Sequence, residues 1–139
     1  MPEPILDSHP HLPAVFTAVV AMQLLARLYY GPWAFRQAWL RAWRLKPAAV
    51  RGTDPVPFVL SLAQAAVTAM SLDYLLRHLG WPGAWGGLRI GLYAWTGFMA
   101  LGLAAHYRFA RVSPRAWVLD AGFELLQLAA AGLILGVLR

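Results

Sequence analysis

Long apolar runs alternate with short polar segments along the whole chain. Four runs reach the length of about 20 residues that a helix needs to cross a bilayer, and they cover approximately residues 12–30, 57–79, 88–109 and 116–138. Lipid offers no hydrogen-bond partner to backbone N–H and C=O groups, so each run must be helical. The pattern therefore predicts an all-α fold, a four-helix transmembrane bundle that forms a single domain over residues 1–139.

Proline and glycine mark the ends of these runs. Gly31-Pro32 ends the first run, and residues 80–87, with four glycines and a proline, separate the second from the third. Pro57 suits the first turn of the second helix, where a missing N–H costs nothing. Ser113 precedes Pro114 and is the predicted N-cap of the fourth helix.

Residues 33–46, between the first two runs, combine aromatic and basic side chains. Trp39 and Trp43 are one helical turn apart, which indicates a short amphipathic helix in the cytoplasmic interface, with rings at headgroup depth. An ordinary aromatic and basic anchor is the simpler interpretation, and specific lipid recognition is the alternative. The expected interfacial anchors are Trp33, Trp39, Trp43, Arg36, Arg41 and Arg44.

The distribution of lysine and arginine predicts the orientation in the membrane. Short cytoplasmic loops are enriched in these residues. The first and third connections lie on the same side of a four-helix bundle and carry eight of them, against three on the other side (Arg77, Arg89 and Arg139). We therefore expect the first and third loops in the cytoplasm and both termini outside, in a multi-pass protein of the cell inner (plasma) membrane.

Composition supports the membrane interpretation. Hydrophobic residues make up 60% of the chain and charged residues 13%, whereas soluble domains carry about 25% charged residues. The net charge of +6 comes from residues between apolar runs, not from a water-soluble basic face, so nucleic-acid binding is not expected. The acidic, proline-rich start of the chain lacks the basic region of a cleavable signal peptide, so the first run is expected to be retained.

The sequence predicts neither a metal site nor a cofactor. Cysteine is absent, which excludes disulfides and thiolate ligands. His9 and His11, with Asp7, offer too few fixed ligands for a metal ion.

Polar residues inside the apolar runs are the candidates for function, because they are costly in lipid. Asp120, Glu124 and Gln127 follow i, i+4, i+7 spacing and share one helical stripe. Arg27, four residues after Gln23, and His106 are expected at a similar depth. A cluster of Arg27, His106, Asp120, Glu124, Gln23 and Gln127 is therefore predicted. It would bind a cation, relay a proton or hold an anionic headgroup; the alternative is a structural pair of Arg27 with Asp120.

Two further features concern helix packing. Asp73 and Arg77 form an i, i+4 pair at the outer end of the second run, expected to reach water. Small residues let helices approach closely. Gly132 with Gly136, and Gly87 with Gly91, form two GxxxG motifs that are expected to meet another helix, including that of a second copy.

Three segments resemble the bacterial membrane family catalogued as domain of unknown function 1761. They are Tyr29-Tyr30-Gly31-Pro32 with Phe35 and Ala38-Trp39; Gly91 with Trp95-Thr96-Gly97-Phe98; and Asp120-Ala121-Gly122-Phe123 with Gly132 and Gly136. Arg36 stands where the family pattern has glycine. The resemblance implies a small four-helix integral membrane protein with no established activity, and it supplies no catalytic or binding residues.

No catalytic motif is visible, because the chain lacks GxSxG, HExxH, Walker-type and Rossmann patterns. The leading interpretation is a non-enzymatic membrane protein acting as an accessory or assembly subunit, in contact with lipid and with a larger complex or a second copy. The alternative is a small oligomeric transporter or proton-linked carrier that uses the polar cluster. A membrane-embedded enzyme is the third interpretation.

Overall fold

The computed structural model describes residues 9–50, 52 and 54–139, and the expected N-terminal tail up to residue 8, with Arg51 and Thr53, lies outside them. Described elements follow one another as α1 (Leu12–Tyr29), α2 (Arg36–Ala42), the 3-10 turn η1 (Pro47–Val50), α3 (Val56–Leu79), α4 (Gly83–Ala94), the π-helical segment η2 (Trp95–Ala100), α5 (Leu101–Phe109) and α6 (Pro114–Leu138). No strand occurs among them.

The predicted all-α bundle of four long helices is confirmed. Four helices are long and apolar enough to cross a membrane: 12–29, 56–79, 83–109 and 114–138, the third formed by α4, η2 and α5 together. This fits a multi-pass membrane protein. The third helix begins at Gly83, five residues before the expected start, because residues 83–87 are already helical and Gly83 and Gly87 lie against α6.

Caps form where the sequence places them. Ser113 Oγ accepts a hydrogen bond from the Arg115 N–H at 3.3 Å at the start of α6, and Gly80 ends α3 with a left-handed φ of 61°. The His11 ring nitrogen accepts from the Ala14 N–H at 3.3 Å, so this side chain caps α1.

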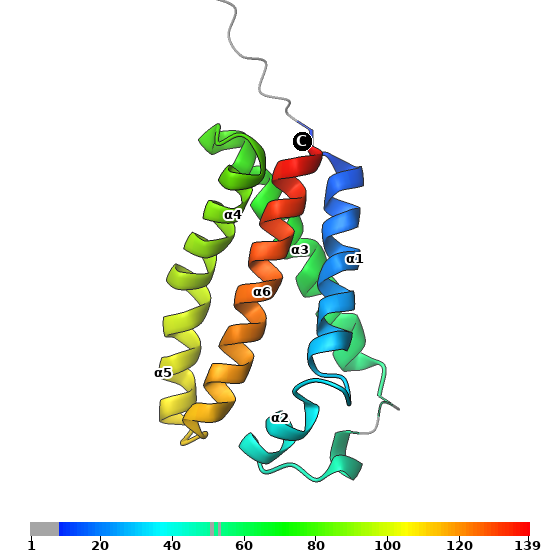
Figure 1. Ribbon diagram of the computed structural model, residues 1–139, viewed down its shortest axis with the longest axis vertical. Coiled ribbons are helices and arrows are strands. Elements are labelled where there is room, and N and C mark those ends of the chain that lie inside the picture. Colours follow the sequence, from blue (N-terminus) through cyan, green and yellow to red (C-terminus); the bar gives the residue numbers. More distant parts are fainter. Residues whose placement is uncertain (1–8, 51, 53) are drawn as a thin grey trace, which may run out of the picture.

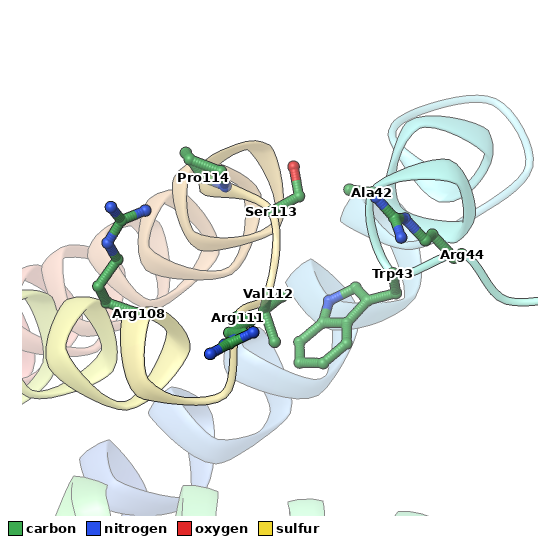
Figure 2. A pocket seen from close by; sticks show the side chains of 8 residues that line it. All are labelled: Ala42, Trp43, Arg44, Arg108, Arg111, Val112, Ser113 and Pro114. Carbon is green, nitrogen blue, oxygen red and sulfur yellow. The ribbon is translucent and has the colours of Figure 1, made fainter.

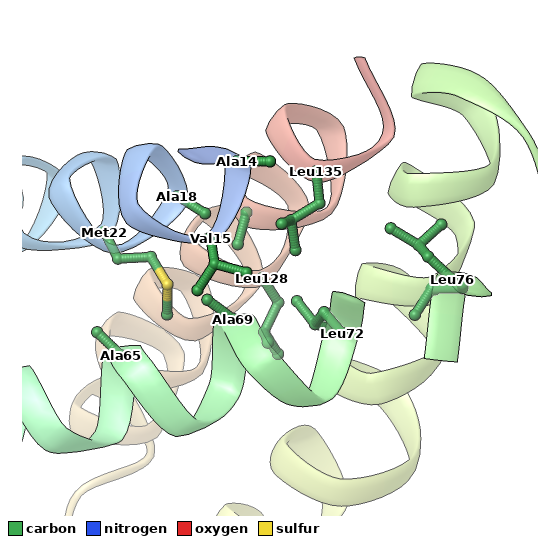
Figure 3. Packing of buried hydrophobic residues seen from close by; sticks show 12 residues of the cluster. Ala14, Val15, Ala18, Met22, Ala65, Ala69, Leu72, Leu76, Leu128 and Leu135 are labelled. Carbon is green, nitrogen blue, oxygen red and sulfur yellow. The ribbon is translucent and has the colours of Figure 1, made fainter. Parts of the chain in front are cut away.

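Helix α6 lies at the centre of the bundle, against α4, α1, α3, α5 and α2. Figure 1 shows α2 folded beneath α1 at one end, called here the α2 end, which also holds the α5–α6 turn; the C-terminus and the α3–α4 turn lie at the opposite end. The core combines alanines, among them Ala14, Ala18, Ala65 and Ala69, with larger aliphatic side chains (Figure 3). Small residues let helix backbones approach closely, as bundles in lipid require.

Bulky apolar side chains face outward instead. Phe16 is 70% exposed and Phe98 is 81% exposed. An outer surface of this kind is suited to lipid, because acyl chains solvate it as well as a protein core does.

The two GxxxG motifs meet each other within one chain. A Cβ on Gly87 or Gly132 would collide with the backbone carbonyl of the other residue, and one on Gly136 would collide with the Gly83 carbonyl. Gly91 lies in the same way against the Leu128 carbonyl. Their close approach joins α4 to α6, so the glycine faces expected to meet a different helix do so inside the chain.

Replacing Gly87 by alanine should lower the free energy of unfolding by about 1–3 kcal/mol, because the added methyl forces α4 away from α6. Gly102→Ala is the matched control: a Cβ there meets nothing within 4 Å, and alanine favours the helix by up to about 1 kcal/mol. Unfolding in mixed micelles measures both. Equal stability of the two variants would contradict the close α4–α6 contact.

Candidate functional site

The Asp120 carboxylate accepts four side-chain hydrogen bonds from neutral aromatic donors at the α2 end. Tyr30 Oη and Trp39 Nε1 donate to its Oδ1, at 2.7 Å and 2.9 Å. Trp43 Nε1 and Tyr107 Oη donate to its Oδ2, at 3.0 Å and 2.9 Å. These four side chains and Asp120 are called here the Asp120 clasp. It joins the end of α1, α2, α5 and α6.

The turn after α1 brings the α2 indoles to the carboxylate. Gly31 permits this turn, because a Cβ there would lie 2.7 Å from the Arg27 carbonyl oxygen. The Phe35 N–H then donates to the Tyr29 carbonyl at 3.0 Å, which turns the chain back under α1. With Trp39 and Trp43 four residues apart, both indoles lie on the face of α2 that meets α6.

The rings of the Asp120 clasp also contact one another. Tyr30 meets Trp39 edge to face at a centroid distance of 5.7 Å, and Trp43 meets Tyr107 in the same way at 5.2 Å. Such aromatic pairs each contribute about 0.5–1.5 kcal/mol beyond the area they bury. The rings therefore shield the hydrogen bonds and hold α2 in place.

The α6 backbone on either side of Asp120 is held as well. Tyr29 Oη donates to the Leu119 carbonyl at 2.8 Å, and Trp95 Nε1 donates to the Ala121 carbonyl at 2.7 Å. Trp117 Nε1 donates to the Ala100 carbonyl at 3.0 Å, at the last residue of the π-helical segment. The π-helical segment widens one turn of the third helix. It lies beside the turn of α6 that contains Asp120.

Four donors match the acceptor capacity of an ionised carboxylate, which has about four lone-pair sites. Hydrogen bonds to the charged form offset the loss of water without a neighbouring cation. Burial, followed by the hydrogen bond to Asp120, raises the pKa of the Tyr30 phenol well above its usual range. Tyr30 therefore stays an O–H donor throughout the physiological pH range.

The predicted polar cluster does not form as expected, because Arg27 and His106 are exposed and neither contacts Asp120 among the described residues. The inward stripe of α1 contains Met22, and Arg27 lies five residues later, which turns it about 140° from that stripe. His106 is next to Tyr107, which faces Asp120, so its own side chain points elsewhere. The structural pair of Arg27 with Asp120 is likewise not formed.

The remaining predicted polar residues lie along a separate line deeper in the bundle. Gln23 Nε2 donates to the Ser61 carbonyl and hydroxyl oxygens at 3.1 and 3.2 Å. Gln64 Nε2 donates to Glu124 Oε1 at 3.5 Å. Gln127 is only 1% exposed, and its Oε1 has no hydrogen-bond partner in the described part of the chain. Side chains of α1, α3 and α6 contribute to this line.

The expected interfacial anchors divide into two groups. Trp33 is 94% exposed, as expected of an anchor. Trp39 and Trp43 instead point inward, where their indole N–H groups donate to Asp120 and do not face outward as anchors. The helix is also shorter than expected, because Arg44 already has a left-handed φ of 55° that ends α2. Arg36 lines a cavity of about 400 Å³ beside Asp120, whereas Arg41 and Arg44 line the space between α2 and the α5–α6 turn.

The Asp73 carboxylate at the opposite end is held by cations instead. It is fully buried, with Arg77 Nε at 3.1 Å and Arg139 Nε at 3.0 Å. The expected pair reaching into water is therefore a buried carboxylate with two arginines. Arg139 joins it because the end of α6 lies beside α3.

Sequence reasoning missed most of these partners. None of the four aromatic donors was expected to bind Asp120, and the polar contacts of Ser61, Gln64 and Arg139 were not expected either. The available signal was the need of each intramembrane polar group for a partner on a neighbouring helix. For Asp120, the tyrosines and tryptophans at the same depth were candidates, since both carry one polar hydrogen on an apolar ring.

Replacing Asp120 by asparagine should lower the free energy of unfolding by about 2–5 kcal/mol, because the amide nitrogen cannot accept hydrogen bonds from the donors it faces. Glu124→Gln is the matched control, because the new amide oxygen can still accept the single 3.5 Å hydrogen bond from Gln64, and it should cost less than about 1 kcal/mol. Denaturant unfolding measures stability, and limited proteolysis between α2 and α3 reports release of α2. An Asp120→Asn protein that resists the protease like the native chain would contradict the clasp.

Comparison with known proteins assigns the fold to a family. The family model described as protein of unknown function (DUF1761) matches residues 13–136, which is most of the chain and includes the whole Asp120 clasp. No curated protein and no solved structure matches the chain. The chain belongs to the DUF1761 family.

Proposed function

We propose that the protein is a non-catalytic accessory subunit of a membrane complex. The α2 end is its working surface, which means the surface that contacts the partner. The observation that carries the proposal is the Asp120 clasp, which uses an intramembrane carboxylate to fix a short surface helix. Three of its four donors come from Tyr30 and α2. An ordinary lipid anchor needs no such fixation, because its tryptophans and arginines work in any orientation that reaches the headgroups.

Charge supports the cytoplasmic location of this surface. Described basic residues at the α2 end are Arg36, Arg41, Arg44, Lys46, Arg108, Arg111 and Arg115, against Arg77, Arg89 and Arg139 at the opposite end. Under the positive-inside rule this excess of cations supports a cytoplasmic α2 end, with both termini outside. A fixed cationic surface at the membrane face is suited to docking a partner rather than to moving a solute.

The accessory role is tested by recovering the protein from its native membrane in mild detergent. The native chain should elute with a partner in fixed ratio, and Asp120→Asn should lose it while remaining inserted, because α2 is released. Glu124→Gln should retain it. Recovery of the native chain alone, or of the partner equally with Asp120→Asn, would rule out this role for the α2 end.

A second candidate, a proton-linked carrier, is favoured by the polar line inside the bundle. Glu124 and the unpaired Gln127 Oε1 lie one turn apart on α6, and intramembrane carboxyls are common on proton routes. Arg27 and His106 are not part of this candidate site.

The carrier is tested in sealed vesicles. A carrier should show proton-coupled uptake that Glu124→Gln abolishes. Asp120→Asn should reduce this uptake only in proportion to the loss of folded protein. These two results together would establish the carrier in place of the accessory role. A proton-coupled flux no higher than that of protein-free vesicles would rule out the carrier function.

A further inference from the structure

We propose that the crevice between α2 and the α5–α6 turn binds a phosphate group, carried by an anionic lipid headgroup or by a soluble phosphate. The proposal rests on the proposed working surface in one respect, since α2 must be fixed for the crevice to exist. It assigns that surface a small ligand in addition to a protein partner.

The crevice consists of two adjoining cavities of about 710 and 630 Å³. Both are lined by Ala42 and Arg44 from the end of α2 and by Ser113 and Pro114 from the start of α6. Figure 2 shows Arg44 on one side of the larger cavity, with Arg108 and Arg111 on the other. A phosphate with a glycerol or similar substituent fits a space of this size.

Five arginines line this crevice, and no acidic side chain does among the described residues. Arg44, Arg108 and Arg111 line the larger cavity, and Arg41, Arg44 and Arg115 line the smaller one. None of the five forms an ion pair within the part of the chain that the structure describes. One guanidinium group can donate two parallel hydrogen bonds to a phosphate, which makes arginine well suited to bind it.

The partly buried carboxylate of Asp120 forms no ion pair with these arginines among the described residues. Asp120 already accepts hydrogen bonds from four neutral donors, so its acceptor sites are occupied. The clasp thus holds α2 with uncharged groups and leaves the guanidinium groups for a ligand. The first turn of α6 adds a partial positive charge at Ser113 and Pro114, which favours an anion there.

Two of the arginines occupy positions where glycine is the usual residue. Arg44 and Arg111 both have φ of 55°, and they are the described non-glycine residues with positive φ. Each follows a helix end of the same type: the Leu45 N–H donates to the Leu40 carbonyl and the Val112 N–H to the Tyr107 carbonyl, both at 2.9 Å. This left-handed backbone conformation favours glycine, because a residue with a Cβ is strained in it. Arginine at both places lowers stability and lines the same cavity.

The simpler interpretation of these arginines is a general electrostatic anchor. An anchor needs charge near the surface, so lysine serves it equally well. A phosphate site needs the planar, two-pronged guanidinium group, so lysine serves it poorly. The left-handed positions add a second distinction, because glycine there should stabilise the fold while removing the ligand contact.

The test uses the purified full chain in phosphatidylcholine nanodiscs, with inorganic phosphate or glycerol phosphate titrated in, and in nanodiscs that also contain phosphatidylglycerol. Native mass spectrometry counts retained anionic lipid, and the unfolding midpoint reports binding of either source. A response to phosphatidylglycerol alone assigns the site to a lipid headgroup. A response to the soluble phosphates as well extends it to free phosphate esters. No response to either overturns the proposal.

The variants separate a specific site from an anchor. Arg44→Gly with Arg111→Gly should raise the ligand-free unfolding midpoint by several degrees and weaken binding at least about tenfold. Arg44→Lys with Arg111→Lys should also weaken binding about tenfold at unchanged charge. Arg89→Gln, at the opposite end over the Trp85 ring, should leave binding unchanged. Full binding by the lysine variant overturns the proposal.

The phosphate-binding test is independent of the accessory role, because phosphate binding is measured on the isolated chain. Loss of phosphate binding in the glycine variant with normal partner recovery would leave the accessory role intact. Loss of the partner in Asp120→Asn bears on the accessory role alone. Only failure of the native chain to bind phosphate overturns the phosphate site in the crevice.

Discussion

A carboxylate that loses much of its water needs hydrogen-bond donors in its place, and the α2 end of this protein is organised around that requirement at the partly buried Asp120. Lipid supplies no donors, so the chain does. The Gly31 turn, the spacing of Trp39 and Trp43 and the depth of Tyr107 all serve to bring N–H and O–H groups to one point. Because the donors belong to separate helices, satisfying the carboxylate also closes this end of the bundle.

The two ends of the molecule solve the same problem differently. Asp73 is balanced by Arg77 and Arg139, so its charge is neutralised where it lies. Asp120 is held by neutral donors only, which leaves the surrounding arginines outside its hydrogen-bond network. One end is therefore closed by ion pairs, and the other combines a fixed surface helix with a cationic crevice. That asymmetry underlies both the proposed working surface and the proposed phosphate site.

Much of the fold could be predicted from sequence, because length, hydropathy and Gly-Pro breaks determine where helices span a membrane. The site could be predicted only in part. Pairing Arg27 with Asp120 assumed that a buried charge seeks an opposite charge, whereas aromatic donors satisfied it. Indoles suit a lipid interface and a buried acceptor equally well, so Trp39 and Trp43 were ambiguous.

The most direct test of the central claim is solid-state NMR of the chain in lipid bilayers, with the indole nitrogens and the aspartate carboxyl carbons labelled. The clasp predicts two indole N–H groups, from Trp39 and Trp43, within hydrogen-bond distance of an ionised Asp120 carboxylate and protected from exchange with water. Indole protons of α2 that exchange freely, or that contact lipid headgroups instead of Asp120, would contradict it.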